Sequence, residues 1–263
     1  MNVRLVGFEA QREKYEDCLK RLGCTPMHDD LPQGEAGLTL VRHAQALADV
    51  RLHVQALSHV FVQHHALSSS DLQVLHKLAS EAGVQVHFSA PTLYRWSIPD
   101  LAVLLRDVKF VQVYKDYEAA APLLIKDLRN EILAAACSVR AKISRTERVR
   151  SIVPCDFEVL GLRVDFLNTA SAYFWLGSAA FTARHELRLF GSKGMAVVDA
   201  LRCETKIKTL DGNFFTTPFL SEEESREKEL ADFVGNLRRG APAFVSVAEA
   251  EVLRTVEEKM SNG

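Results

Sequence analysis

The chain has 263 residues, of which 48% are hydrophobic and 25% are charged. Lysine and arginine total 32 against 34 aspartate and glutamate residues, which gives a formal net charge of -2. This balance offers no bulk attraction to nucleic acid or to an anionic membrane, so we expect a small molecule or another protein as the partner. No stretch approaches the ~20 apolar residues of a membrane span, and the first apolar run is too short for a signal peptide, which predicts a cytoplasmic protein.

The first third of the chain alternates short apolar runs with amphipathic stretches. Strands are expected at 3–6, 24–27, 38–41, 59–62 and 84–88, and helices at 13–22, 47–57 and from the N-cap serines 68–70 to Gly83. Strands and helices that alternate at this interval predict a parallel sheet covered on both faces. We therefore expect an α/β fold that starts with an abbreviated Rossmann-like domain over residues 1–98.

The pattern changes after Pro99. A short helix at 101–105, a strand at 110–114 and a long apolar helix at 123–139 lead into a stretch from 149 to about 217 whose apolar residues recur with period two. Two helices, 222–238 and 247–260, complete the chain. This predicts an α+β domain with an open antiparallel sheet over residues 99–263.

Five segments, in order along the chain, carry a resemblance to one protein family. Residues 59–69 and 75–86 are similar to a strand ending in Glu-Lys-Pro with the helix and strand that follow it. Residues 94–99 are similar to an Arg-Phe-x-Pro hinge segment, 189–194 to a Gly-x-x-Gly turn, and 229–234 with Pro242 to a closing helix. In this order they resemble the glucose-fructose oxidoreductase and inositol dehydrogenase (Gfo/Idh/MocA) family. The chain looks like a divergent, shortened member, because the Glu-Lys-Pro position comes early and a strand or helix is expected to be missing between 24 and 37.

The resemblance implies an oxidoreductase that uses NAD or NADP and acts on a sugar-like or polyol-like small molecule. A dinucleotide-binding turn needs glycines, because backbone amides at the helix N-terminus must approach the pyrophosphate closely. Here Gly7 is kept, whereas Glu9 and Arg12 occupy the other two glycine positions. Two like charges ~4 Å apart cost on the order of 4 kcal/mol at an effective dielectric constant of about 20, so Glu9 predicts weak or absent dinucleotide binding, which Arg12 offsets in part.

Three further residues belong to the implied cofactor site. Asp29 follows the turn at the distance where an acid would hold the adenosine ribose, although a solvated Asp29–Asp30 turn is an equally good interpretation. Arg42 and His43 stand where the family usually has a Thr-Pro pair beside the nicotinamide. That replacement again argues against ordinary cofactor geometry.

The family's chemistry uses the lysine of Glu-Lys-Pro and, on the first long helix of the second domain, an Asp with a His four residues later. Gln63, His64 and His65 occupy the Glu-Lys-Pro positions, Asp127 matches the Asp, and Glu131 replaces the His. His64, Asp127 and Glu131 are therefore the catalytic candidates, since an imidazole beside carboxylates is competent as a general acid or base. Alternatively, His64 is a remnant at a strand end and Asp127 is a solvated helix residue. Neighbouring strand residues point to opposite faces, so we expect no shared metal ion on His64 and His65.

The remaining expectations concern the ligand and the partners. Tyr94 and Arg95 either contact a sugar or carboxylate substrate or pack at the hinge. Strand 172–176 has apolar residues on both faces while helices cover one, which predicts a homo-oligomer, at least a dimer, through the outer face of the second sheet. For function, two alternatives to the oxidoreductase remain open. One is a non-catalytic member that binds a ligand or a full-length paralogue in a regulatory or assembly role, and the other is redox-neutral acid/base chemistry at His64.

Overall fold

The computed structural model describes residues 1–27, 37–118, 123–153, 157–178, 180 and 182–261. The chain forms two compact units, one made of Met1–Pro91 with Glu223–Arg254, the other of Thr92–Glu222 with Thr255–Gly263. A segment near the C-terminus thus returns to the first unit, whereas the sequence pattern placed all of 99–263 in the second domain. No helix in the described part of the chain has the length and apolar character needed to cross a membrane.

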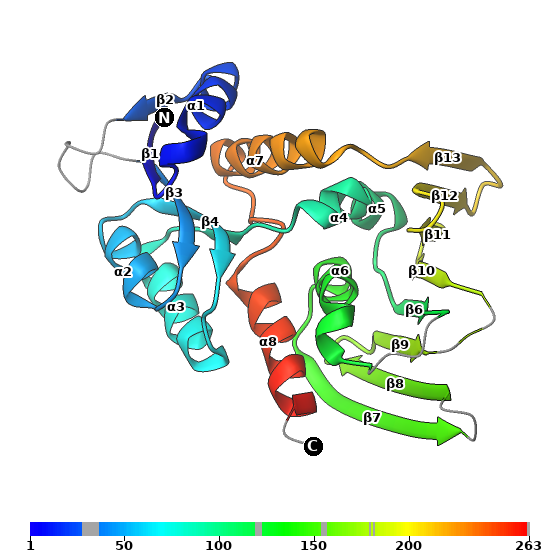
Figure 1. The fold of residues 1–263 in the computed structure, drawn as a ribbon. Coiled ribbons are helices and arrows are strands. Elements are labelled where there is room, and N and C mark those ends of the chain that lie inside the picture. Colours follow the sequence, from blue (N-terminus) through cyan, green and yellow to red (C-terminus); the bar gives the residue numbers. More distant parts are fainter. Residues whose placement is uncertain (28–36, 119–122, 154–156, 179, 181, 262–263) are drawn as a thin grey trace. The chain divides into compact units, whose positions relative to one another are not determined.

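The first unit is built on a parallel five-stranded sheet in the order β2-β1-β3-β4-β5 (Figure 1). Its strands are β1 (Asn2–Val6), β2 (Thr25–Met27), β3 (Leu38–Ala44), β4 (His59–His65) and β5 (Val86–Phe88). Its helices are η1 (Glu9–Gln11), α1 (Arg12–Arg21), α2 (Ala48–Gln55), α3 (Ser69–Ala82), most of α7 (Glu222–Arg239) and the first half of α8 (Val247–Ser261). The predicted Rossmann-like sheet is confirmed.

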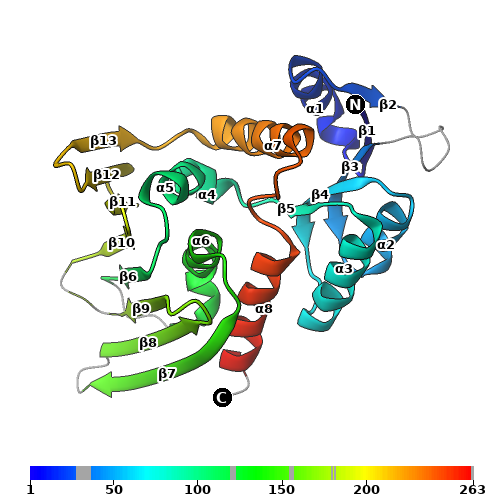
Figure 2. The same ribbon diagram turned by 180° about the vertical axis from the view of Figure 1, so that it is seen from behind.

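Both faces of this sheet are covered, which explains its continuous apolar strands. Residues Leu38 to Val41 of β3 are all buried, as is usual when a parallel strand has helices on either side. Helices α2 and α3 lie together on one face (Figure 2), and α1 and α7 share a core with the other face through Leu19 and Phe233. Burying side chains of this size stabilises the fold by roughly 1.5–3 kcal/mol each. This core fixes α1 and α7 beside the first strands.

The second unit is built on an eight-stranded sheet in the order β13-β12-β11-β10-β6-β9-β8-β7. Its strands are β6 (Phe110–Asp116), β7 (Ile143–Val153), β8 (Phe157–Phe166), β9 (Ser171–Gly177), β10 (Arg184–Gly191), β11 (Gly194–Asp199), β12 (Glu204–Thr209) and β13 (Phe214–Pro218). All neighbouring strands are antiparallel except β6 and β9, which run parallel. The predicted open antiparallel sheet is therefore confirmed, with one parallel pair in its middle.

Helices of the second unit lie over one face of its sheet (Figure 1). They are α4 (Pro91–Arg95), α5 (Ile98–Leu105), η2 (Ile125–Leu128) and α6 (Arg129–Val139). The predicted continuous helix over 123–139 is divided, because a 3-10 turn precedes α6. The predicted Gly191–Gly194 turn joins β10 to β11, and a Cβ atom at Gly191 would collide with the backbone of Arg106, so this position needs glycine.

Candidate functional site

The turn after β1 keeps one feature of a dinucleotide-binding turn and loses the others. Gly7 has a φ of +77°, a conformation that glycine adopts easily. Phe8 then turns into the core, where its ring lies 4.5 Å from the ring of Tyr15. The 3-10 helix η1 begins at Glu9, whose side chain is exposed. An apolar side chain and a tight extra turn therefore replace the open glycine backbone.

The charges at the amino end of α1 also oppose a phosphate. Glu9 and Glu13 are the acidic residues of the first turns of η1 and α1. Arg12 does not offset them, since its Nε donates to Glu16 Oε1 at 2.8 Å and its Nη2 donates to the backbone oxygen of Met27 at 3.5 Å. Phosphate binds at a helix N-terminus because free amides and the helix dipole favour negative charge there. The residues present do not fit a dinucleotide diphosphate at this turn.

The predicted residues on β3 and β4 do meet. His43 and His64 are neighbours across the two strands, and their rings stack with centroids 5.2 Å apart. Burial lowers the pKa of His64, and the positive charges of His43, Arg42 and Arg226 lower it further. His64 therefore favours the neutral imidazole, the form that accepts a proton.

His64 and His65 diverge, as the strand geometry predicts. The ring of His65 lies 4.4 Å from the ring of Phe88, whereas His64 stacks on a different neighbour. Within the described residues, no group of three or more histidine, cysteine or acidic side chains is arranged to hold a metal ion. Asp29, the predicted ribose-binding acid, lies outside the described residues.

The two predicted carboxylates of the second unit have different surroundings. Asp127 belongs to η2, and its Oδ2 accepts a hydrogen bond from the backbone N–H of Leu124 at 3.1 Å, so its carboxylate caps this short helix. Glu131 lies in α6 and is buried. Asp127 thus lies in a 3-10 turn and Glu131 in the α-helix that follows it directly, so the two residues do not share one regular helix. Whether either residue meets His64 stays a prediction.

Glu131 is the centre of a buried polar cluster. Its Oε1 accepts hydrogen bonds from His185 Nε2 at 2.5 Å and from Lys115 Nζ at 3.2 Å. The same lysine donates to the backbone oxygen of Asp127 at 2.5 Å. Burial raises the pKa of Glu131, but the hydrogen bond from His185 and the charge of Lys115 outweigh it, so the pKa lies below its ordinary value. Glu131 is therefore a carboxylate at neutral pH.

The fold brings these three side chains together through strand pairing. Lys115 on β6 and His185 on β10 are direct neighbours across the antiparallel pair. Both are in phase with the buried residues of their strands, Val113 and Leu187, so they face the helices, and α6 supplies Glu131 from that side. Sequence reasoning missed Lys115 and His185. The sequence pattern that could have revealed them is a basic residue that alternates in step with the apolar residues of a strand.

The predicted substrate residues pack within the second unit. Tyr94 is buried in α4, while the Arg95 guanidinium lies 5.9 Å from the ring centroid of Phe219. The neighbouring Trp96 reaches the Glu131 cluster, with its ring edge-on to His185 at a centroid distance of 5.8 Å. A substrate contact by Tyr94 or Arg95 stays a prediction.

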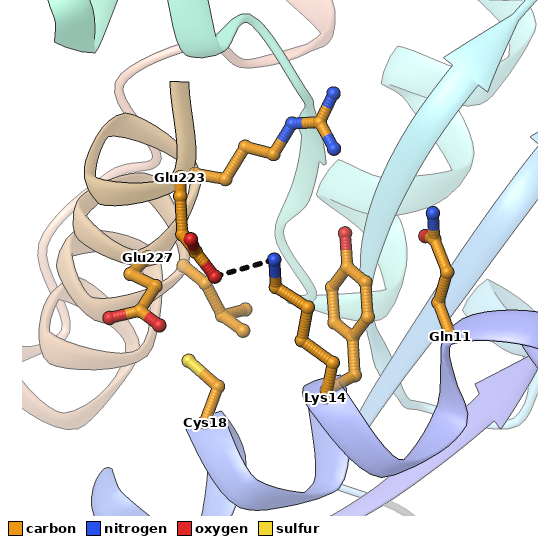
Figure 3. A pocket seen from close by; sticks show the side chains of 8 residues that line it. Gln11, Lys14, Cys18, Glu223 and Glu227 are labelled. Atoms are coloured by element: carbon orange, nitrogen blue, oxygen red, sulfur yellow. Dashed lines mark ion pairs between the residues drawn. The ribbon is translucent and has the colours of Figure 1, made fainter. Parts of the chain in front are cut away.

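Among the cavities in the described part of the first unit, two are lined by residues of α7. The smaller, of about 60 Å³, is bounded by α1 and α7, and Lys14 reaches across it to Glu223 at 2.6 Å (Figure 3). The larger, of about 100 Å³, lies at the carboxyl end of β4 and is lined by Tyr15, Phe61, Gln63, His64, Ser89, Pro91, Arg226, Glu229 and Leu230. Its place at the carboxyl edge of a parallel sheet is where open α/β folds bind ligands.

No protein-family model matches the sequence, and neither does any curated protein. Among solved structures, an NAD-binding oxidoreductase from Klebsiella pneumoniae is similar, with a TM-score of 0.68 at 12% identity, covering 98% of this chain and 95% of that one. UDP-N-acetylglucosamine 3-dehydrogenase from Acidithiobacillus ferrooxidans has a TM-score of 0.65 at 13% identity, covering 98% of this chain and 96% of that one. A dehydrogenase from Clostridium difficile has a TM-score of 0.65 at 9% identity, covering 100% and 99%. The chain therefore has the fold of Gfo/Idh/MocA-type dehydrogenases, as the resemblance in its sequence implied.

Proposed function

We propose that this protein is an oxidoreductase that acts on a hydroxylated small molecule of the sugar or polyol class, and that His185 exchanges the proton of the reacting group. The observation that carries this proposal is the buried Glu131 carboxylate, bound by both His185 and Lys115. The His185 side chain keeps 20% of its surface exposed, so a ligand can reach it.

The cluster suits proton transfer. As His185 takes a proton, the imidazolium is stabilised by the Glu131 carboxylate that already accepts its Nε2 hydrogen bond. Lys115 keeps Glu131 ionised throughout, because its ammonium group lies 3.2 Å from the carboxylate oxygen. His185 is thus the group that moves the proton. Glu131 orients the His185 ring and stabilises its positive charge, and Lys115 keeps Glu131 ionised.

The structural neighbours support the reaction class and the substrate class unequally. One is a UDP-N-acetylglucosamine dehydrogenase, and an oxidoreductase from Agrobacterium radiobacter was solved with NAD+ and L-tartaric acid, both ligands with hydroxyl groups. A biliverdin reductase from Synechocystis has the same fold at a TM-score of 0.55. The fold thus favours redox chemistry, while the sugar-like substrate rests on the resemblance in the sequence.

A nicotinamide dinucleotide would supply the hydride acceptor or donor for such a reaction. The turn at Gly7 does not fit its diphosphate, so the role assigned to this chain's residues is limited to proton transfer. Because this turn does not fit the diphosphate, a second function is also supported, in which the protein binds its ligand without a dinucleotide. It would then be a redox-neutral acid/base catalyst, or a non-catalytic partner of a full-length paralogue.

Turnover of candidate polyols and nucleotide sugars, followed by absorbance of NADH and NADPH, tests the first function. His185→Gln should lower turnover by about 10² to 10⁴, as expected for loss of a general acid or base. His76→Gln, a change at an exposed histidine of α3, is the matched control and should leave turnover intact. Full activity of His185→Gln would overturn the assignment. Calorimetry that detects neither dinucleotide, with no turnover, would put the second function first.

We also propose that the protein forms a dimer through the outer face of the second sheet. Phe110, Tyr173 and Phe190 form an aromatic group there, with ring centroids 5.5 and 5.7 Å from Phe110, and Trp175 is 44% exposed. Apolar surface of this kind usually marks an interface. Sedimentation should therefore give more than the 29.3 kDa of one chain, and Trp175→Glu should shift it toward that mass. A wild-type mass of one chain would contradict the proposal.

A further inference from the structure

Another cavity of the first unit lies at the amino end of β5, the sheet edge opposite to the one where open α/β folds usually bind ligands. Its volume is about 320 Å³, and small-molecule sites typically have volumes of about 300–1,000 Å³. Its walls come from α3, the start of β5, the segment between α7 and α8, and the first turn of α8. The residues that line it include Ala79, Ser80, Val84, Gln85, Ala243 and Ala248, which all belong to the first unit.

Hydrogen bonds fix one wall of this cavity. Gln85 Nε2 donates to the backbone oxygen of Ala241 at 2.8 Å. The backbone N–H of Phe88 donates to the backbone oxygen of Val245 at 3.0 Å. The segment between α7 and α8 is therefore attached to β5 at two points. Because a ligand does not have to order this wall, less conformational entropy is lost on binding.

The lining of the cavity favours a neutral ligand. Its described lining residues include no aspartate, glutamate, lysine or arginine, and the titratable His76 is exposed to water. The amino end of α8 does not attract an anion either, because the Glu249 carboxylate already accepts the backbone N–H of Ser246 at 2.9 Å. Ala79, Val84 and Ala243 are buried apolar residues. A largely apolar molecule without charge therefore fits this cavity best.

Gln85 contributes one polar atom that lacks a partner. Its Nε2 is bound to Ala241, whereas its Oε1 is buried and has no hydrogen-bond partner among the residues that the structure describes. The contact with Ala241 sets the orientation of the amide, so the atom left over is an acceptor and not a donor. A buried acceptor without a donor is destabilising, and an N–H or O–H group of a ligand would remove that penalty.

We propose that this cavity binds a small, neutral, mainly apolar ring compound whose N–H or O–H donates a hydrogen bond to Gln85 Oε1. Sites of this kind usually combine apolar walls with a few polar groups that orient the ligand. Here the apolar walls are Ala79, Val84 and Ala243, and Gln85 is the orienting group. The proposal is independent of proton transfer at His185, since all the residues that it uses belong to the first unit.

Indole and benzofuran are matched probes for this site, because they have nearly the same shape and only indole carries an N–H. The full chain, labelled at its alanine methyl groups for NMR, is titrated with each probe. Indole should shift the methyl signals of Ala79, Ala243 and Ala248 in a saturable way, because all three residues line the cavity. Loss of one neutral hydrogen bond should make benzofuran bind about two- to tenfold more weakly.

Variants of the apolar wall localise the binding. Ala248→Leu adds a branched side chain at a half-buried lining residue and should weaken indole binding about tenfold or more, because it occupies part of the cavity. Ala48→Leu, at an exposed alanine of α2, is the matched control and should leave the affinity unchanged. Circular dichroism checks folding, and Ser80→Leu, at an exposed lining residue, replaces Ala248→Leu if that variant unfolds.

Variants of Gln85 test the hydrogen bond. Gln85→Met removes the acceptor, so indole and benzofuran should bind this variant equally. Gln85→Glu also loses the donor to Ala241 but keeps an acceptor oxygen, so it should still prefer indole. The proposal is overturned if neither probe shifts the three methyl signals in a saturable way, if the wild type binds both probes equally, or if the cavity-filling variant binds indole as the wild type does.

Discussion

Each unit buries one glutamate against a histidine, and the two pairs differ in their contact with water. Glu229 and His87, 2.9 Å apart in the first unit, are 1% and 0% exposed. Glu131 in the second unit is also 1% exposed, but its partner His185 is 20% exposed. A bound ligand can therefore exchange a proton with His185 but cannot reach His87. Burial of a titratable pair is therefore not by itself a sign of chemistry, and the exposure of the histidine separates the two cases.

The first pair holds structure together. Glu229 accepts hydrogen bonds from Ser89 Oγ at 2.8 Å and from the backbone N–H of Ala90 at 2.5 Å, in addition to the histidine. The His87 ring contacts the rings of Phe61 and Phe233, at centroid distances of 5.0 and 5.1 Å, and those two rings also lie 5.9 Å from each other. Helix α7 is thereby attached to the segment that follows β5. The three hydrogen bonds to this carboxylate therefore hold α7 against residues 87–90.

The largest expected effect follows from removing that attachment. Glu229→Ala leaves three donors without their acceptor, two of them buried, and each buried loss costs about 1–3 kcal/mol, so we expect the free energy of unfolding to fall by about 3 kcal/mol or more. Glu229→Gln keeps an acceptor oxygen and should cost less. Denaturant unfolding measures both. Glu81→Ala, at an exposed i, i+4 pair with Lys77, is the control, and an equal loss there would remove the structural role of Glu229.

A smaller loss of stability is expected from Glu131→Gln. Breaking a fully buried ion pair costs about 3–5 kcal/mol, but Lys115 is 18% exposed and keeps some hydration, so we expect about 2 kcal/mol. In contrast to Glu229→Gln, this variant should also lose turnover, because His185 loses its carboxylate. Adding Lys115→Met should restore part of the stability and none of the turnover. Recovery of turnover in the double variant would show that His185 does not need the Glu131 carboxylate.

The pH dependence of stability should sharpen the contrast. The pKa of Glu131 is lowered from 4.5 in the folded protein, despite burial, by the His185 hydrogen bond and the Lys115 charge. As the pH falls below 4.5 the unfolded chain takes up the proton first, so this contribution to stability is present above that pH and is lost as the pH falls through the folded pKa. Unfolding in the acid range should show the difference between wild type and Glu131→Gln shrinking. A constant difference would mean that Glu131 is not ionised in the fold.

The sequence was sufficient for the fold because its signals are local. The apolar run 38–41 predicts a strand buried on both faces, and the Ser68–Asp71 capping box and Gly83 mark both ends of α3. Period two over β8 to β12 predicts the second sheet. The division of helix 123–139 was missed because Asp127 forms a cap with Leu124, and a side-chain cap competes with helix in a way that the apolar pattern does not register.

The candidate site was predicted only in part, because its contacts are not local. The resemblance implied catalytic roles for His64 and Glu131, and the structure shows Glu131 at the centre of a polar cluster. Its partners Lys115 and His185 are joined by a strand pairing that no spacing in the sequence reveals. The sequence does show that Lys115 and His185 alternate in step with the apolar residues Val113 and Leu187, which places them on the buried face of the sheet. A basic residue on such a face needs an acidic partner. The identity of that partner required the structure.

The smallest expected effect concerns His64, which is exposed whereas His185 is partly buried, and which has the opposite charge environment. Burial and the positive charges of His43, Arg42 and Arg226 lower its pKa, whereas His185 lies against a carboxylate. Arg226→Gln should therefore raise the pKa of His64 toward its ordinary value without restoring it fully, because burial and the other two charges remain. An NMR titration free of phosphate and carboxylate buffers measures the change, and Arg51→Gln should leave the pKa of His64 where it was. If Arg226→Gln has no effect, the arginine does not face the histidine, and the charge environments of the two histidines differ less than the structure indicates.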